Sequence, residues 1–279
     1  MKIEQSHIHI QGYPGSFHDE VASNYFKEQS NLKCYDSFRE QANGFKESNS
    51  NDFAVMAIEN SIAGSILQNY KLIQENQFSI VGETYLRIEM NFMALGGSKL
   101  NDIEIVRSHP MALYQCQNFL SKFQFKQHEA EDTAKSAKEI QDNNLEHVAT
   151  IASRKAASIY NLEIIEEGIQ DNQLNYTRFF ILSTQSFPQT GNKASISCTL
   201  PHSKGSLAQV LQYFSSQEIN LSKIQSYPIL GKPNHYKFYI DLEFSEQRTS
   251  NEVNHLLENQ TVEHALLGLY TKAGPDTNS

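Results

Sequence analysis

The sequence has few cysteines, no long apolar run and no concentrated basic segment, and each absence excludes a class of protein. The three cysteines, Cys34, Cys116 and Cys198, are odd in number and widely separated in 279 residues. This pattern fits neither a disulfide framework nor a cysteine-rich zinc site, so we expect reduced structural thiols. No stretch approaches the ~18 apolar residues that a membrane-spanning helix needs, so no membrane partner is expected.

The charge pattern also excludes several functions. The formal net charge is -9, from 23 Lys and Arg against 32 Asp and Glu, and the basic residues are scattered, which argues against a nucleic-acid partner. The histidines show no HExxH spacing, and the chain has no Walker or GxGxxG phosphate loop, so neither a metal nor another cofactor is expected. The first seven residues lack the apolar core of a signal peptide, which predicts a cytoplasmic location.

Up to about residue 183, short apolar runs alternate with helical patterns. The expected strands are 7–11, 53–58, 103–107 and 147–152, and each is followed by a helical segment. This alternation indicates an α/β sheet with helices on both faces. The uninterrupted apolar run 53–58 indicates a strand that is buried on both faces of a parallel sheet.

Five segments of this part of the chain are unusually polar, and the fifth precedes the apolar run that begins at Phe179. They are residues 12–18, 59–65, 108–115, 132–133 and 172–178. In open α/β sheets the ligand lies beyond the carboxyl ends of the strands, where we place all five segments. Helices begin after most of the segments, and the free N–H groups of helix starts favour anions. We therefore expect an anionic ligand at this edge.

A polar, turn-rich segment at 184–193 separates a second module with a different pattern. The expected elements are a strand at 194–200, a helix at 206–217, strands at 219–230 and from 236, a helix at 252–258 and a strand at 262–271. This β-α-β-β-α-β order is that of a ferredoxin-like α+β unit. We expect domains at 1–183 and 194–272, a linker at 184–193 and a disordered tail at 273–279.

Seven motifs, in order, resemble the prephenate dehydratase family over nearly the whole chain. They are Gly12-x-x-Gly15-Ser16-Phe17, Ile58-Glu59-Asn60-Ser61-x-x-Gly64-Ser65, Ser108-His109-Pro110, Gln115-Cys116, Thr133-Ala134, Ile151-Ala152-Ser153 and Asp171-Asn172-x-x-Asn175-x-Thr177-Arg178-Phe179. The resemblance implies a two-lobed α/β catalytic domain, similar to periplasmic binding proteins, with a cleft between two subdomains. It also implies a hydro-lyase without cofactor, which removes water and carbon dioxide from prephenate to give phenylpyruvate in L-phenylalanine biosynthesis.

The resemblance assigns roles to particular residues. Thr177 would protonate the leaving hydroxyl, a positioned acid being worth ~10²–10⁴-fold in rate. The other expected catalytic residues are Glu59, Asn60 and Gln115. The expected substrate-binding residues are Arg178, Phe179, Ser61, Ser16 and Thr133, of which Arg178 would hold a carboxylate in a bidentate pair. Met111 and His18-Asp19 depart from the residues common in the family.

The second module resembles an ACT domain, a regulatory unit that binds amino acids at subunit interfaces. The resemblance implies feedback regulation by L-phenylalanine and a homodimer or homotetramer. The expected L-phenylalanine site comprises Gly205, Ser206, Leu207, Ala208, Asn220, Leu221, Gln225 and Ser226. Many relatives have Glu-Ser-Arg-Pro where this chain has Gln225-Ser226-Tyr227-Pro228, and the loss of a carboxylate and a guanidinium is expected to alter binding.

Alternatives stay open at this point. Arogenate dehydratase performs the same chemistry on the aminated substrate. A non-catalytic amino-acid-binding regulatory protein has the same two-lobed architecture, although the lack of an export signal argues against a periplasmic receptor. We expect no chorismate mutase domain ahead of residue 7.

Overall fold

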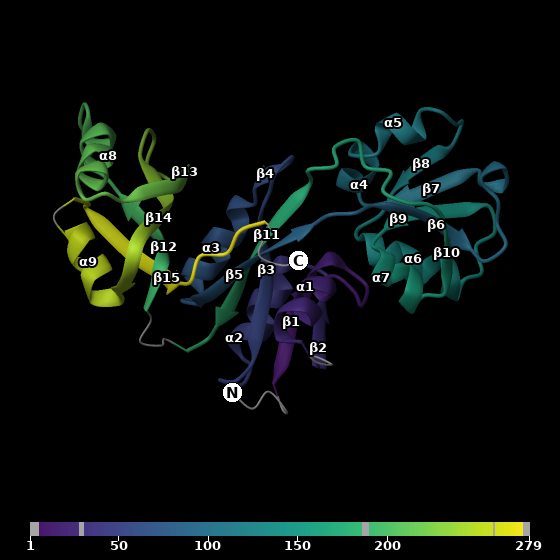
Figure 1. Cartoon of the computed structure of the whole chain (residues 1–279), viewed down its shortest axis with the longest axis horizontal. Coiled ribbons are helices and arrows are strands. Elements are labelled where there is room, and N and C mark those ends of the chain that lie inside the picture. The colour runs from purple at the N-terminus through teal and green to yellow at the C-terminus, as the bar shows by residue number, and fades with distance from the viewer. Residues whose placement is uncertain (1–5, 28–30, 186–189, 259, 276–279) are drawn as a thin grey trace.

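The structure is a computed structural model that describes residues 6–27, 31–185, 190–258 and 260–275. Figure 1 shows three bodies: a first lobe in the middle, a second lobe on the right and a C-terminal module on the left. The first lobe and the C-terminal module share one ten-stranded sheet, and a five-stranded sheet forms the second lobe. No helix in the described part of the chain is long and apolar enough to cross a membrane.

The first lobe contains a mixed sheet. Its strands are β1 (His7–Gln11), β2 (Asn31–Tyr35), β3 (Phe53–Asn60), β4 (Gly64–Ser65), β5 (Ser79–Arg87) and β11 (Tyr176–Ser183). Strand β1 is parallel to β2 and β3, whereas β11 is antiparallel to β3 and β5. The prediction of a parallel sheet around β3 is therefore wrong on its β11 side. Because β11 runs the opposite way, its first residues lie at the edge where β3 ends.

Helices cover both faces of this sheet, as predicted. Helix α1 (Phe17–Phe26) packs on the face that carries Val55 and Ala57. Helices α2 (Phe38–Lys46) and α3 (Leu67–Glu75) pack on the face that carries Met56 and Ile58. The apolar run of β3 thus follows from its burial on both sides.

A β-bulge interrupts β3 next to the polar residues that follow it. Ala57 pairs with Phe179 and Glu59 pairs with Arg178, so Ile58 has no partner of its own in the β11 ladder. An extra residue of this kind reverses the alternation of side chains along the strand. As a result, Asn60 pairs with Thr177, and Glu59 faces the side opposite to Ala57.

The second lobe has the sheet order β10-β6-β9-β7-β8. Its elements are β6 (Asn91–Leu95), a 3₁₀ helix (Leu100–Asp102), β7 (Ile105–Ser108), α4 (Pro110–Tyr114), α5 (Gln117–Leu120), β8 (Lys126–Glu129), α6 (Thr133–Asp142), β9 (Val148–Ala152), α7 (Arg154–Ile159) and β10 (Leu162–Glu166). Two adjacent connections join the lobes, with a 2.7 Å hydrogen bond from Ile88 N to Asn175 O and a 2.9 Å bond from Ile169 N to Met90 O.

The C-terminal module has the predicted β-α-β-β-α-β order. Its elements are β12 (Thr190–Thr199), α8 (Ser206–Ser216), β13 (Asn220–Pro228), β14 (Tyr236–Thr249), α9 (Ser250–Glu258) and β15 (Glu263–Tyr270). Strand β12 begins at Thr190, so part of the expected linker is strand. Residues 186–189 of that linker and 276–279 of the expected tail lie outside the described residues.

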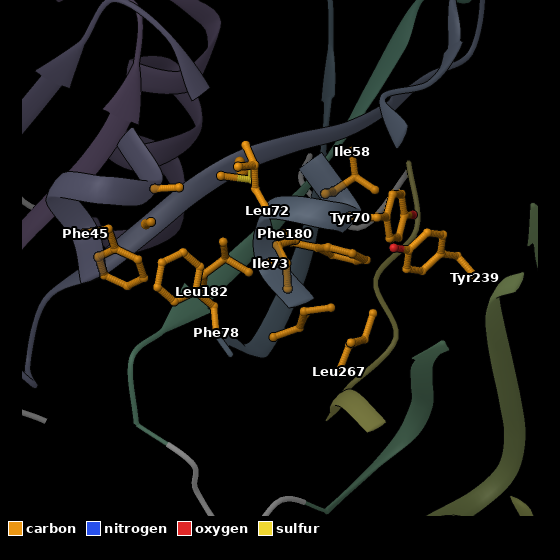
Figure 2. Close-up of a cluster of buried hydrophobic side chains, with 14 of the residues drawn as sticks. Phe45, Ile58, Tyr70, Leu72, Ile73, Phe78, Phe180, Leu182, Tyr239 and Leu267 are labelled. Carbon is orange, nitrogen blue, oxygen red and sulfur yellow. The ribbon is translucent and has the colours of Figure 1, made fainter. Parts of the chain in front are cut away.

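The module is joined to the first lobe by a strand pair and a shared core. Gly268 of β15 pairs with Ile80 of β5, and a Cβ at Gly268 would lie 2.2 Å from the Ile80 carbonyl oxygen, so this approach requires glycine. Figure 2 shows the core, in which Tyr239 of the module lies beside Tyr70 of α3 with ring centroids 5.0 Å apart. Because its members come from both parts, this core fixes how the module sits.

The three cysteines are free thiols, as expected. Cys116 and Cys198 are buried among apolar side chains, whereas Cys34 is exposed.

Candidate functional site

A cleft of about 690 Å³ lies between the two lobes. The first lobe contributes residues from α1, α2, β3 and β11, and the second lobe contributes residues from α4 and the start of α6. Six of the residues that the sequence predicts for a site line this cleft: Thr177, Asn60, Gln115, Phe179, Ser16 and Thr133. They come from five separate segments of the chain, and the fold brings them together.

A chain of side-chain amides crosses the cleft from one lobe to the other. Asn60 Nδ2 donates to Thr177 Oγ1 at 3.0 Å and to Asn175 Oδ1 at 2.7 Å. Asn175 Nδ2 in turn donates to Gln115 Oε1 at 2.9 Å. Asn175 is fully buried between them, so it links Asn60 of the first lobe to Gln115 of the second. Asn175 is part of the motif at residues 171–179, but only these contacts show that it links the two lobes.

The orientation of the Asn60 amide is set by its backbone neighbours. Its Oδ1 accepts hydrogen bonds from Ile62 N at 3.0 Å and Ala63 N at 2.9 Å. The Nδ2 group must therefore be the one that faces Thr177, and the Thr177 oxygen is an acceptor in this contact. The hydroxyl proton of Thr177 stays available to a ligand, because no acceptor for it is found among the described residues.

His18 and Phe179 form an apolar part of the cleft wall. Their rings meet edge to face with centroids 5.1 Å apart. Burial lowers the pKa of His18 to about 3, so this histidine is neutral at physiological pH. Its Nε2 accepts from Ala57 N at 3.2 Å, which fixes the ring. His18 therefore shapes the cleft and has no proton to donate from Nε2.

Three helix N-termini point to the cleft through their capping residues, which all line it. Ser16 caps α1 by accepting from Asp19 N, Ser37 caps α2 and Asp132 caps α6. Helix N-termini carry partial positive charge and unpaired N–H groups, so they favour anions. The prediction that helices begin after the polar segments 12–18 and 132–133 is confirmed, and the start at Ser37 adds to it.

The charges that line the cleft are unequal in number. Arg39 on α2 is the one Lys or Arg among the described lining residues, and it is exposed. Three carboxylates also line the cleft: Asp36, Glu131 and Asp132. Burial raises the pKa of Asp132 from its ordinary value. Arg39 is not among the residues predicted from the sequence, because nothing around it forms a motif.

The close contact between the lobes depends on the glycines of the first motif. Gly15 has φ +86, and a Cβ there would lie 2.7 Å from the Ala156 Cα of α7. Its carbonyl accepts from Ser153 Oγ at 2.5 Å. Gly12 has φ +96, and its Cβ would lie 2.9 Å from Asp132 Oδ2. A larger residue at Gly15 would meet the backbone of α7 and separate the walls of the cleft, whereas at Gly12 it would displace the Asp132 carboxylate. The positive φ of both positions also favours glycine.

Arg178 and Glu59, both expected to act in the cleft, lie on the opposite side of the sheet. The Arg178 guanidinium is buried against Glu83 and the C-terminal module's Asp241. Glu59 Oε2 lies 3.0 Å from Lys223 Nζ of the same module. The expectation is corrected for a physical reason: Arg178 alternates with Thr177 along β11, and the bulge at Ile58 places Glu59 on the Arg178 side.

Ser61 is also absent from the cleft lining. Its hydroxyl donates to Leu174 O at 3.0 Å and accepts from Tyr176 N at 3.0 Å. It fastens the end of β3 to the segment before β11, so its observed role is structural.

The expected residues of the second module fall into two separate places. Ser206 and Leu207 line a cavity of about 500 Å³ next to the start of α8, where Gly205 has φ +83. Asn220, Leu221, Gln225 and Ser226 lie on β13, at the edge of the ten-stranded sheet, and none lines that cavity. Within one chain these two segments do not form one pocket. In the described parts of the whole chain, no three His, Cys, Asp or Glu side chains are grouped as a metal site requires.

Residues 8–187 match the family model described as prephenate dehydratase. An Arabidopsis thaliana protein, arogenate dehydratase/prephenate dehydratase 2, chloroplastic, is 39% identical over 221 residues, covering 74% of this chain and 58% of that protein. The chain thus spans less than two thirds of that relative's length. The prephenate dehydratase of Methanocaldococcus jannaschii is 35% identical over 231 residues, covering 81% of this chain and 84% of that protein.

Solved structures show the same two-lobed arrangement. Prephenate dehydratase from Arthrobacter aurescens, solved in complex with L-Phe, superposes with a TM-score of 0.81 at 23% identity. The match covers 96% of this chain and 90% of that chain, so the fold is shared from the first lobe through the C-terminal module.

Proposed function

The chain belongs to the prephenate dehydratase family, and we propose that it removes water and carbon dioxide from prephenate to give phenylpyruvate. The single observation that carries the proposal is the Asn60–Thr177 contact at the wall of the cleft. In this contact Thr177 keeps its hydroxyl proton for a ligand, as protonation of a leaving hydroxyl requires.

The remaining lining of the cleft supports the same reaction. Prephenate carries two carboxylates, and the helix starts at Ser16 and Ser37 together with Arg39 provide positive potential for an anion. Gln115 Oε1 accepts a hydrogen bond from Asn175, so the Gln115 amide nitrogen is the group that can donate to substrate oxygens. Phe179 and His18 provide an apolar wall for the ring, and Thr133 lies on the opposite wall.

Negative charge that develops on Thr177 Oγ1 as its proton leaves would be stabilised by the Asn60 amide. Such a pre-oriented donor costs no reorganisation at the moment of reaction. The C–O bond of the protonated hydroxyl and the bond between the ring and its carboxylate break, so that water and carbon dioxide leave and the ring becomes aromatic. A proton from solvent restores the Thr177 hydroxyl, and this chain's contribution to the bond-breaking step is to hold the carboxylate and the hydroxyl in position.

Arogenate dehydration is the second candidate, because three carboxylates line the cleft and arogenate carries an ammonium group. Prephenate comes first because two of these carboxylates already have partners in the protein. Asp36 accepts from Tyr13 Oη at 2.8 Å, and Glu131 pairs with Lys135 at 2.5 Å.

The test is to supply the purified full chain with prephenate or arogenate and to quantify phenylpyruvate and L-phenylalanine. We expect kcat/KM for prephenate to exceed that for arogenate by about tenfold or more. A reversed ratio would assign the second function. Turnover of neither substrate by the folded chain would reject both.

We further propose that residues 190–272 form an ACT domain that binds L-phenylalanine between two copies of the chain. The separation of Ser206 and Leu207 from Gln225 and Ser226 supports a site completed by a second subunit. A family member solved with L-Phe supports the ligand. Calorimetric titration with L-phenylalanine, with sedimentation to measure the oligomer, tests this: a monomer that binds no L-phenylalanine contradicts it.

A further inference from the structure

Arg178 joins the strand that carries Thr177 to the C-terminal module. Its Nε and Nη2 lie 2.7 and 2.6 Å from Glu83 Oε2 on β5. Its Nη1 lies 2.5 Å from Asp241 Oδ2 on β14, and its Nη2 donates to Tyr270 Oη on β15 at 3.1 Å. Arg178 is therefore held on one side by the first lobe and on the other by the module.

Four buried side chains close a ring of hydrogen bonds around this contact: Arg178, Tyr270, Ser195 and Asp241. Ser195 Oγ donates to Asp241 Oδ1 at 2.6 Å, so the proton between Ser195 and Tyr270 must come from Tyr270, at 2.6 Å. Burial raises the pKa of Tyr270 well above its ordinary value, which keeps that proton in place. Each donor in the ring therefore faces an acceptor at hydrogen-bond distance.

The charges around the ring are also paired. Lys193 of β12 donates to both carboxylate oxygens of Glu83 at 3.1 Å, and Glu83 Oε1 also accepts from Ala273 N at 3.0 Å. Two buried carboxylates, Glu83 and Asp241, thus face two buried cations, Arg178 and Lys193. The less buried Glu59 and Glu243 lie 4.0 Å from Arg178 and 3.6 Å from Lys193, at the edge of the same cluster. Neutralising Asp241 therefore removes one of the two buried carboxylates that hold the Arg178 guanidinium.

We propose that Asp241, Ser195 and Tyr270 of the C-terminal module are positioning residues for Thr177, acting through Arg178. The proposal deepens the proposed function, because it takes Thr177 as the acid of that reaction. The Arg178 ring fixes the backbone at the start of β11. Thr177 is the preceding residue on the other face, so the ring sets where its hydroxyl meets Asn60.

Contacts from several neighbours hold the start of β11 in place. The start of β11 pairs with β3 beyond the bulge and with β5. The guanidinium carbon of Arg178 also lies 4.8 Å from the ring centroid of Phe180. Phe180 is a member of the core shown in Figure 2. A catalytic hydroxyl requires placement within fractions of an ångström, and packed neighbours on the opposite face provide it.

The experiment compares Asp241→Asn and Tyr270→Phe with Glu246→Gln in the full chain. Glu246 is an exposed acid on the same strand as Asp241 and is remote from the ring. Hydrogen exchange followed by mass spectrometry measures peptides that cover residues 174–180 and, as an internal reference, β9 in the second lobe. In Asp241→Asn we expect amides at the start of β11 to exchange roughly tenfold faster while β9 is unchanged.

Steady-state kinetics on prephenate give the second readout. We expect kcat to fall by about tenfold in Asp241→Asn, with a smaller fall in Tyr270→Phe, and KM to stay within about twofold. If β9 loses as much protection as the start of β11 in Asp241→Asn, the role of Asp241 is merely structural and the proposal is overturned. The proposal is also overturned if the exchange rates and kcat of Asp241→Asn equal those of Glu246→Gln. If Asp241→Asn does not fold, Tyr270→Phe decides by the same criteria. If the wild-type chain turns over neither prephenate nor arogenate, the proposed function fails. Hydrogen exchange at the start of β11 then tests by itself whether the ring around Arg178 holds this strand in place.

Discussion

The Asn60 side-chain amide donates a 3.0 Å hydrogen bond to the Thr177 hydroxyl, and the two residues pair across β3 and β11. This contact unites two motifs that are 117 residues apart. It also decides the polarity of the Thr177 group, whose oxygen accepts from Asn60 and whose proton is free for a ligand. The contact forms because Ile58 is an extra residue in β3, which returns Asn60 to the cleft face.

Replacing Thr177 by Val should abolish most of the activity while leaving the fold intact. Valine has the same shape and strand preference but no hydroxyl, so we expect kcat to fall by ~10²–10⁴-fold. Thr177→Ser keeps the hydroxyl and should retain most of the rate. Initial-rate measurements on prephenate check both variants, and equal rates for Val and Ser would remove Thr177 from the chemistry.

Asn175→Ala should weaken both activity and stability. The substitution breaks the link from Asn60 to Gln115 and leaves buried amide groups unsatisfied, which costs about 1–3 kcal/mol of unfolding free energy. We expect kcat to fall by about tenfold, because Asn60 and Gln115 lose their mutual orientation. Urea denaturation and initial rates measure the two effects. Asn172→Ala is the matched control, since Asn172 lies in the same segment but is exposed.

Arg39→Ala should weaken substrate binding more than catalysis. Arg39 is the lone Lys or Arg among the described residues that line the cleft, and the proposed substrate, prephenate, is a dianion. We expect KM to rise by about tenfold with kcat little changed, as for loss of an interaction made equally in the ground and transition states. Added salt should raise KM in wild type more than in Arg39→Ala.

The control for Arg39 is Lys46→Ala, an exposed cation at the other end of the same helix that does not line the cleft. Its KM should equal that of wild type. If both variants raise KM alike, overall charge rather than a contact in the cleft is responsible.

Stability should fall below pH 6.5 because of His18. The unfolded histidine takes up a proton near its ordinary pKa of 6.5, whereas the folded one resists it until about 3. The unfolded chain therefore binds more protons between these values, and the unfolding free energy decreases as pH falls through this window. By pH 4.5 the loss amounts to about 3 kcal/mol.

His18→Gln keeps an acceptor for Ala57 N but cannot titrate. Urea denaturation at pH 7.5 and 4.5 should show a loss in wild type that exceeds the loss in His18→Gln by about 3 kcal/mol. Equal losses in the two proteins would mean that His18 is not buried in its neutral form.

Local features of the fold could be predicted from the sequence because they depend on neighbouring residues. The run 53–58 is a strand buried on both faces, and helices follow the polar segments 12–18 and 108–115, as predicted. The β-α-β-β-α-β order expected for residues 194–271 is the order of the C-terminal module. Capping, turn formation and burial of an apolar face each act within a few residues, so the sequence shows them directly.

Long-range pairing decided the rest. By itself the sequence determined that Asn60, Gln115 and Thr177 belong to one set, since motifs in order identify a family. Only the tertiary structure decided that Arg178 and Glu59 face the C-terminal module, that Asn175 links the lobes and that Arg39 lines the cleft. The reason is that a strand has two faces, and a single bulge or an antiparallel neighbour, set by residues far away in the chain, exchanges them.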